Sequence, residues 1–74
     1  MHPMNALVLN PTSTDEKNRL LHTLQTETLQ PDEKVEYCRI IEDDGETDTM
    51  YVIVYTPRVR SMVTRLWAIG WLIE

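Results

Sequence analysis

The stretch that decides the fold is VEYCRIIEDDGETDTMYVIVYT, residues 35–56. Its two ends, 35–42 and 50–56, are rich in Val, Ile, Tyr and Thr, which suit a pleated, half-buried surface. The polar run between them is acidic and contains Gly45, which can supply the positive φ of a tight connection. We therefore predict an antiparallel hairpin with an acidic loop at its tip.

The register of this hairpin decides which side chains share a face, because successive residues of a strand point to opposite sides. We expect Ile40 to pair with Met50. The face beneath the helices then carries Cys38, Ile40, Met50, Val52 and Val54. The opposite face carries Val35, Tyr37, Arg39, Tyr51, Ile53 and Tyr55. A slip by one residue on one strand would mix these two sets.

Before the hairpin, the sequence predicts a strand and a helix. The apolar run 6–9 stops at Asn-Pro, residues 10–11, which ends a strand. Ser13 followed three residues later by Glu16 is a capping-box pattern, which begins a helix. The apolar stripe of this helix, with two polar members at its flanks, consists of Lys17, Leu20, Leu21, Leu24 and Thr28. Pro31 ends the helix near residue 29.

After the hairpin, Thr56 followed by Pro57 predicts the start of a second helix, with Thr56 as the N-cap and Pro57 in the first helical position. The apolar stripe of this helix consists of Val59, Met62, Val63, Leu66 and Ile69. Gly70 suits the left-handed residue that ends a helix. Residues 71–74 are predicted to form a short last strand, and the alternative is a three-stranded sheet with a helical C-terminus.

This order, β-α-β-β-α-β, resembles the ferredoxin-like architecture, an α+β two-layer sandwich. Right-handed crossovers would place the first and third strands centrally in an antiparallel sheet. Both helices would then cover one sheet face and leave the other uncovered. The resemblance concerns architecture alone and implies no functional residue, because this fold hosts many unrelated activities.

Composition narrows the class of protein. The chain has 74 residues, which we interpret as one domain, 1–74, with 1–5 flexible. Its formal net charge of −5 opposes binding to nucleic acid or to an anionic membrane. The expected binding partner is instead a larger protein with a basic surface. A single cysteine, Cys38, excludes an intramolecular disulfide and indicates a reducing compartment. The sequence shows no signal peptide or long apolar run, so we expect a cytoplasmic protein.

The residue pattern predicts no enzyme, no metal site and no cofactor. His2, His22 and Cys38 are isolated from one another, whereas transition-metal sites need closely spaced ligands. The acids around Gly45 do not follow the EF-hand spacing, so a solvated acidic tip is the simpler interpretation. The only other glycine is Gly70, which leaves no glycine-rich phosphate loop.

Three arginines belong to the predicted second helix. Arg58 and Arg60 lie in its first turn, where a positive charge opposes the helix dipole. A bound anion near Thr56 would offset this cost, and so would ion pairs of the arginines with acids such as Glu33 or Glu36. We expect the ion pairs, because acids outnumber bases by twelve to seven. Arg65 is the third arginine.

We interpret the protein as a small non-enzymatic protein-binding module. It would act as an inhibitor or regulator of a larger nucleic-acid-handling complex, of the type that phages and mobile elements encode. The expected partner-binding residues are Tyr37, Arg39, Asp43, Asp44, Glu46, Tyr51, Tyr55 and Trp67. A homodimer through the open sheet face is a further expectation. The alternative function is a single-stranded nucleic-acid binder that stacks bases on the tyrosine-bearing face.

Overall fold

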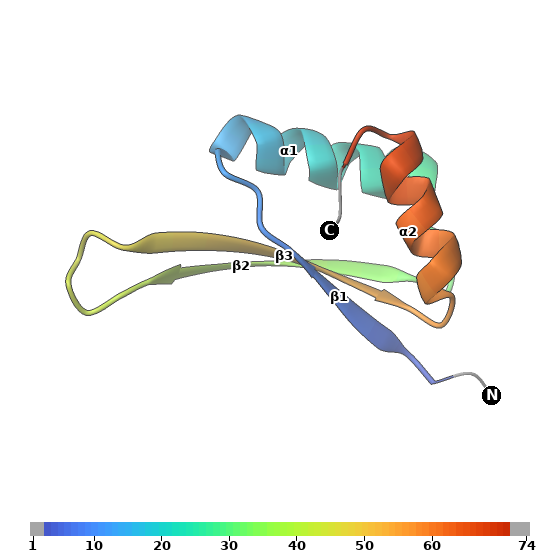
Figure 1. Cartoon of the computed structure of the whole chain (residues 1–74), viewed down its shortest axis with the longest axis horizontal. Coiled ribbons are helices and arrows are strands. Elements are labelled where there is room, and N and C mark those ends of the chain that lie inside the picture. The colour runs from blue at the N-terminus through green and yellow to red at the C-terminus, as the bar shows by residue number, and fades with distance from the viewer. Residues whose placement is uncertain (1–2, 72–74) are drawn as a thin grey trace.

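The computed structural model describes residues 3–71 as a small sheet with helices on one of its faces (Figure 1). The elements are β1 (Asn5–Leu9), α1 (Thr14–Thr23), η1 (Leu24–Thr28), β2 (Lys34–Ile41), β3 (Asp48–Thr56) and α2 (Val59–Ala68). Within residues 3–71 the strands form one antiparallel sheet in the order β1-β3-β2. The predicted α+β class and the antiparallel sheet are therefore confirmed.

The predicted last strand, 71–74, falls mostly outside the described part of the chain. Its first residue, Trp71, is not in a strand, and residues 72–74 are not described. Among the described strands, β3 is central and β1 and β2 form the two edges.

The predicted register of the hairpin is wrong by one residue. Met50 pairs with Arg39 rather than with Ile40, and Cys38 pairs with Tyr51. The two faces of β3 are as predicted, since Val52 and Val54 are fully buried under the helices. The faces of β2 are exchanged. Consequently Val35, Tyr37, Arg39 and Ile41 lie on the helix side, whereas Cys38 and Ile40 lie on the open side.

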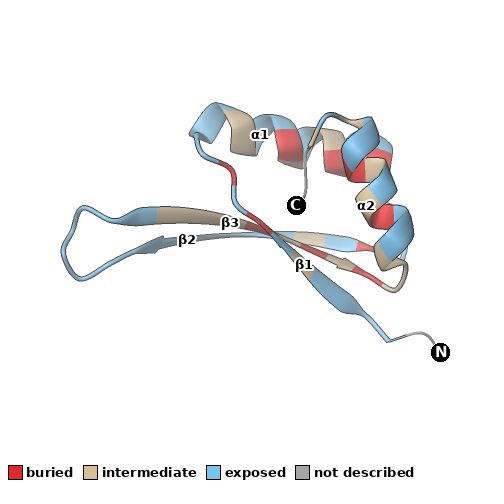
Figure 2. Ribbon diagram, viewed as in Figure 1, coloured by how far each residue is buried: buried red, intermediate tan, exposed pale blue. Residues whose placement is uncertain are grey.

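The physical reason for this register lies at the base of the hairpin, where the helices cover β2. Val35 pairs with Val54 there and is half-buried against the core. The other register would bury Lys34 and Glu36 at this level, and an unpaired charge is costly to bury. Farther along, the hairpin projects beyond the helices, where β2 is exposed on both faces and residues 49–51 of β3 are half-buried (Figure 2). Burial therefore constrains the register at its base and not at its tip.

The start of α1 follows the sequence prediction. The Ser13 hydroxyl accepts a hydrogen bond from the Glu16 amide at 3.1 Å, as an N-cap does. The Glu16 carboxylate bonds the Thr12 hydroxyl at 2.7 Å, so the reciprocal bond of a capping box is replaced by a side-chain contact. The last turn widens into the π-helical segment η1, in which the Leu29 amide donates to the Leu24 carbonyl at 2.9 Å. The helix ends before Pro31, as predicted.

The start of α2 differs from the prediction, whereas its end agrees. Thr56 is the last residue of β3 and not the N-cap; its hydroxyl accepts a hydrogen bond from the Arg58 amide at 2.9 Å. At the other end, Gly70 has φ +87°. The Trp71 amide donates to the Leu66 carbonyl at 2.8 Å, and the Gly70 amide donates to the Trp67 carbonyl at 3.0 Å. These two bonds form a Schellman motif, which needs a left-handed residue where glycine stands.

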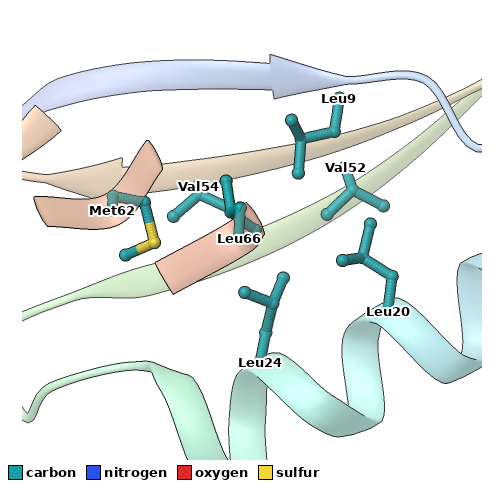
Figure 3. Packing of buried hydrophobic residues seen from close by; sticks show 7 residues of the cluster. All are labelled: Leu9, Leu20, Leu24, Val52, Val54, Met62 and Leu66. Carbon is teal, nitrogen blue, oxygen red and sulfur yellow. The ribbon is translucent and has the colours of Figure 1, made fainter. Parts of the chain in front are cut away.

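The core lies between the sheet and the two helices (Figure 3). Its buried members come from β1, α1, η1, β3 and α2. They are Leu9, Leu20, Leu24, Val52, Val54, Met62 and Leu66. Both predicted helix stripes therefore face the core, and Trp71 packs at its margin.

Replacing Leu66 by alanine should destabilise the fold by about 2–5 kcal/mol, because the truncation leaves a cavity in a fully buried site. The matched control is Trp67→Ala, one residue away in the same helix, where the side chain is 53% exposed. That variant should change the free energy of unfolding by no more than about 0.5 kcal/mol. Urea denaturation measures both, and equal effects would contradict the described packing.

Candidate functional site

The candidate functional site is the open face of the sheet, which no described element covers (Figure 2). Its side chains alternate with those that face the helices. The open face carries Ala6, Val8, Lys34, Glu36, Cys38, Ile40, Thr49, Tyr51, Ile53 and Tyr55. Val8 is 55% exposed and Ile40 is 45% exposed. An apolar surface of this kind on a small domain is typical of a protein contact.

The polar groups of the open face are few. Glu36 accepts a hydrogen bond from the Tyr55 hydroxyl at 3.1 Å, and this bond raises the pKa of Tyr55. Lys34 pairs across the ladder with Tyr55 and is exposed. Cys38 is an exposed free thiol opposite Tyr51. The prediction that Cys38 lies beneath the helices is therefore wrong. One cation and one carboxylate therefore flank an otherwise neutral surface.

The predicted gathering of three tyrosines with Arg39 does not occur. Tyr51 and Tyr55 lie on the open face, whereas Tyr37 and Arg39 lie on the helix side. The Lys17 ammonium sits 4.4 Å from the centre of the Tyr37 ring, a cation–π contact that ties α1 to the hairpin. The Arg39 guanidinium forms a bidentate ion pair with Asp48 on β3.

The acidic tip has one residue that organises the loop. The Asp44 carboxylate accepts hydrogen bonds from the amides of Glu46 and Thr47, each at 2.8 Å, and from the Thr47 hydroxyl at 2.6 Å. These bonds lower the pKa of Asp44. Gly45 adopts φ +71° beside it. Within residues 3–71 no ion pair engages Glu42, Asp43 or Glu46, so their charges face solvent at the end of the hairpin.

Trp67 lies away from this surface. It is exposed on α2, which packs on the helix side of the sheet. The structure thus divides the predicted partner-binding residues among the open face, the acidic tip, the helix side of the hairpin and the outer surface of α2. Tyr51 and Tyr55 share the open face, Tyr37 and Arg39 share the helix side, and the three acids share the tip.

The arginines of α2 are used within the protein, around Glu33. The Glu33 side chain is fully buried. The Arg65 guanidinium donates two hydrogen bonds to its carboxylate, of 2.7 and 2.9 Å. The Thr56 hydroxyl donates to the same carboxylate at 2.5 Å and the Gln30 amide at 2.7 Å. Hydrogen bonds from Arg65 hold the pKa of Glu33 at about 2, against burial, which raises it. The ion-pair prediction for Glu33 is therefore confirmed.

The two remaining arginines differ from each other. Arg58 bonds Asp32 at 2.5 Å, and this hydrogen bond lowers the pKa of Asp32. Arg58 also lies 3.5 Å from Glu33. Arg60 is exposed and makes no ion pair within the described chain. Glu36 bonds Tyr55 and not an arginine. Because Glu33 binds the Thr56 hydroxyl and Asp32 binds Arg58, an anion site at the start of α2 has lost two of its expected ligands.

A hollow of about 250 Å³ lies between α1 and the end of α2. Its lining residues are Glu16, Arg19, Leu20, Thr23, Ile69, Gly70 and Trp71. Glu16 is bonded to Thr12, and the lining contains no paired nucleophile and base. We therefore assign no chemistry to this hollow.

Sequence reasoning missed Val8, Cys38 and Ile40 as members of the open face. The signal that would have found the β2 residues is the triplet Lys-Val-Glu at 34–36. Only one of its faces is apolar, and the helices must cover that face. Membership of Val8 follows from pairing with Ile53 on β3, which no local pattern specifies.

Comparisons with protein-family models, with curated proteins and with solved structures gave no match to this chain. Within residues 3–71 no helix is long and apolar enough to cross a membrane.

Glu33 and its hydrogen-bond donors Arg65, Thr56 and the Gln30 amide form the Glu33 cluster. This cluster predicts that the fold loses stability in acid. Because the pKa of Glu33 is about 2 in the folded protein and 4.5 ordinarily, its ionised form stabilises the folded state. This contribution, about 3 kcal/mol, is complete above pH 4.5 and is lost as the pH falls toward 2. In denaturant unfolding, the variant Glu33→Gln should have a lower free energy of unfolding than the wild type at neutral pH. Its free energy of unfolding should also fall less steeply as the pH is lowered toward 2.

The matched control is Glu36→Gln, which changes an exposed carboxylate. It should keep the acid dependence of the wild-type protein. If Glu33→Gln and the wild type lost stability in parallel between pH 5 and pH 2, the stabilising role of the Glu33 cluster would be refuted.

Proposed function

We propose that this protein is a non-enzymatic protein-binding module that docks a basic partner through the open face and the acidic tip. The observation that carries the proposal is an uncovered sheet face with exposed Val8 and Ile40. On this surface Tyr51, Ile53 and Tyr55 supply the large side chains that interface centres favour.

The charge of the surface selects the partner. The acidic tip holds Glu42, Asp43 and Glu46 free of ion pairs within the described chain, and the whole chain carries −5. A partner with an apolar centre and a basic margin would match both features, since complementary potentials speed association and exclude wrong partners. Many basic protein surfaces bind nucleic acid. An inhibitor or regulator that occupies such a surface, of the kind phages and mobile elements encode, is the functional class that we propose.

The ferredoxin-like architecture is part of the same proposal. The described strand order β1-β3-β2 with helices on one face is compatible with a fourth strand beside β1. A cytoplasmic location likewise stays a proposal, supported by the single cysteine. Single-stranded nucleic-acid binding is not favoured by any observation, because Tyr37 and Arg39 do not share a face with Tyr51 and Tyr55.

The proposal is tested by affinity capture with nuclease-treated lysates, followed by purification of the captured protein and measurement of its affinity. The double variant Tyr51→Ser/Ile53→Ser should bind at least about tenfold more weakly, because it removes central interface side chains. The tip variant Asp43→Asn/Glu46→Gln should bind more weakly and with less dependence on salt.

Trp67→Ser is the matched control, since it removes an exposed aromatic residue from α2 and leaves the open face intact. It should bind like the wild type. Loss of binding in Trp67→Ser with retention in Tyr51→Ser/Ile53→Ser would move the site to α2. Recovery of nucleic acid alone, abolished by nuclease, would overturn the proposal.

A further inference from the structure

The outer edge of β2 is a second surface, distinct from the open face. Within residues 3–71 this strand pairs only with β3. It is eight residues long, contains no proline, and is exposed along its length except at Val35. Natural edge strands are commonly protected by proline, by bulges or by charged side chains such as lysine, and of these β2 carries Lys34 at its first position. Here the register runs without a bulge from Lys34 to Ile41, so the edge is open to another strand.

The hairpin shows which backbone groups point outward. The Glu42 amide donates to the Thr47 carbonyl at 2.8 Å, in continuation of the ladder in which Ile41 pairs with Asp48. In an antiparallel ladder the backbone groups alternate between the two sides of a strand. The even-numbered residues of β2 therefore bond β3. The odd-numbered residues, Val35, Tyr37, Arg39 and Ile41, direct their N–H and C=O groups to the open edge.

We propose that two copies of this chain join antiparallel through this edge, with Cys38 on the two-fold axis. The symmetry requires that facing residues lie on the same side of the sheet, so even-numbered residues face even-numbered ones. Centring the axis on Glu36 or on Arg39 would bring like charges together. Centring it on Tyr37 would place Lys34 against Ile40 and Glu36 against Cys38, which pairs no charges.

The Cys38-centred register matches side chains on both faces, except that Glu36 faces Ile40 of the second copy. On the open side, Lys34 faces Glu42 of the second copy, and Cys38 faces its own equivalent. On the helix side, Val35 faces Ile41, and Tyr37 faces Arg39 of the second copy. Opposite charges, apolar groups, and an aromatic ring with a cation are thus paired. About eight main-chain hydrogen bonds would form between the outward groups.

The dimer does not compete with the proposed function. Two three-stranded sheets would join into one, and their open faces would form one larger, continuous surface. An edge contact is smaller than the roughly 1,600 Å² of a standard stable interface. The association will therefore depend on protein concentration.

The first test is sedimentation equilibrium of the full chain under reducing conditions, over about a hundredfold range of concentration. The wild type and Cys38→Ser should both shift from monomer to dimer. Lys34→Glu should dimerise roughly tenfold more weakly, because it sets two symmetric pairs of like charges against each other. Lys34→Glu/Glu42→Lys should restore the wild-type constant. A monomer at all concentrations, or failure of the double variant to recover, would overturn the proposal.

The second test fixes the register by disulfide trapping with diamide. Two Cys38 thiols lose two protons and two electrons to diamide, which becomes the hydrazine, and form one S–S bond. Facing residues in a non-hydrogen-bonded pair have Cα atoms about 4.5 Å apart, within disulfide range. Wild-type protein should therefore cross-link readily at concentrations where it dimerises.

The matched controls use the Cys38→Ser background. Glu36→Cys and Ile40→Cys should not cross-link when each is alone, because four residues of strand separate like positions by about 13 Å. Mixed together they should cross-link, since residue 36 of one copy faces residue 40 of the other. Efficient cross-linking of Glu36→Cys alone would refute this register. The outcome is independent of the search for a partner, so the two proposals fail separately.

Discussion

The buried carboxylate of Glu33 is the interaction on which the arrangement of the elements depends. It lies just before β2 and receives hydrogen bonds from Arg65 on α2, Thr56 at the end of β3 and the Gln30 amide after η1. Arg65 also donates to the Thr28 carbonyl at 2.8 Å, in the last turn of η1. One side-chain pair therefore joins both helical segments to the two strands of the hairpin. A buried charge is tolerable only with such a complete set of partners.

The same cluster explains where the helices lie along the sheet. It anchors α2 and the end of η1 to the base of the hairpin, and the apolar core fills the space beside it (Figure 3). The hairpin then extends past the helices, and the molecule measures 42 × 25 × 22 Å along its principal axes. Lys17 over Tyr37 and Arg39 with Asp48 are the contacts that hold the projecting part.

This geometry leaves two exposed surfaces, the open face of the sheet and the outer edge of β2. The open face presents side chains, and the outer edge of β2 presents backbone groups. A partner on the face and a second copy at the edge can therefore be accommodated together. The acidic tip belongs to both, because Glu42 lies at the end of the edge and Asp43 and Glu46 extend beyond it. Charge at the tip thus influences both contacts.

Much of the fold was predictable from local pattern. The two helix stripes, the serine cap of α1, the glycine at the end of α2 and the acidic turn each depend on neighbours in sequence. The position of the α2 N-terminus was not predictable from local pattern. Thr56, the predicted N-cap, is the last residue of β3, and its hydroxyl donates a hydrogen bond to Glu33. The membership of Val8 in the open face was not predictable either, because no local pattern specifies its pairing with Ile53.

The sequence by itself determined the α+β class, the order of the described elements and the acidic character of the tip, because periodicity, capping residues and charge are local properties. Only the tertiary structure decided the register of β2 against β3. That register depends on which residue the helices bury at the hairpin base, Val35 or its charged neighbours. A slip of one residue moved Cys38 to the open face and Tyr37 and Arg39 away from it, and so changed the candidate site.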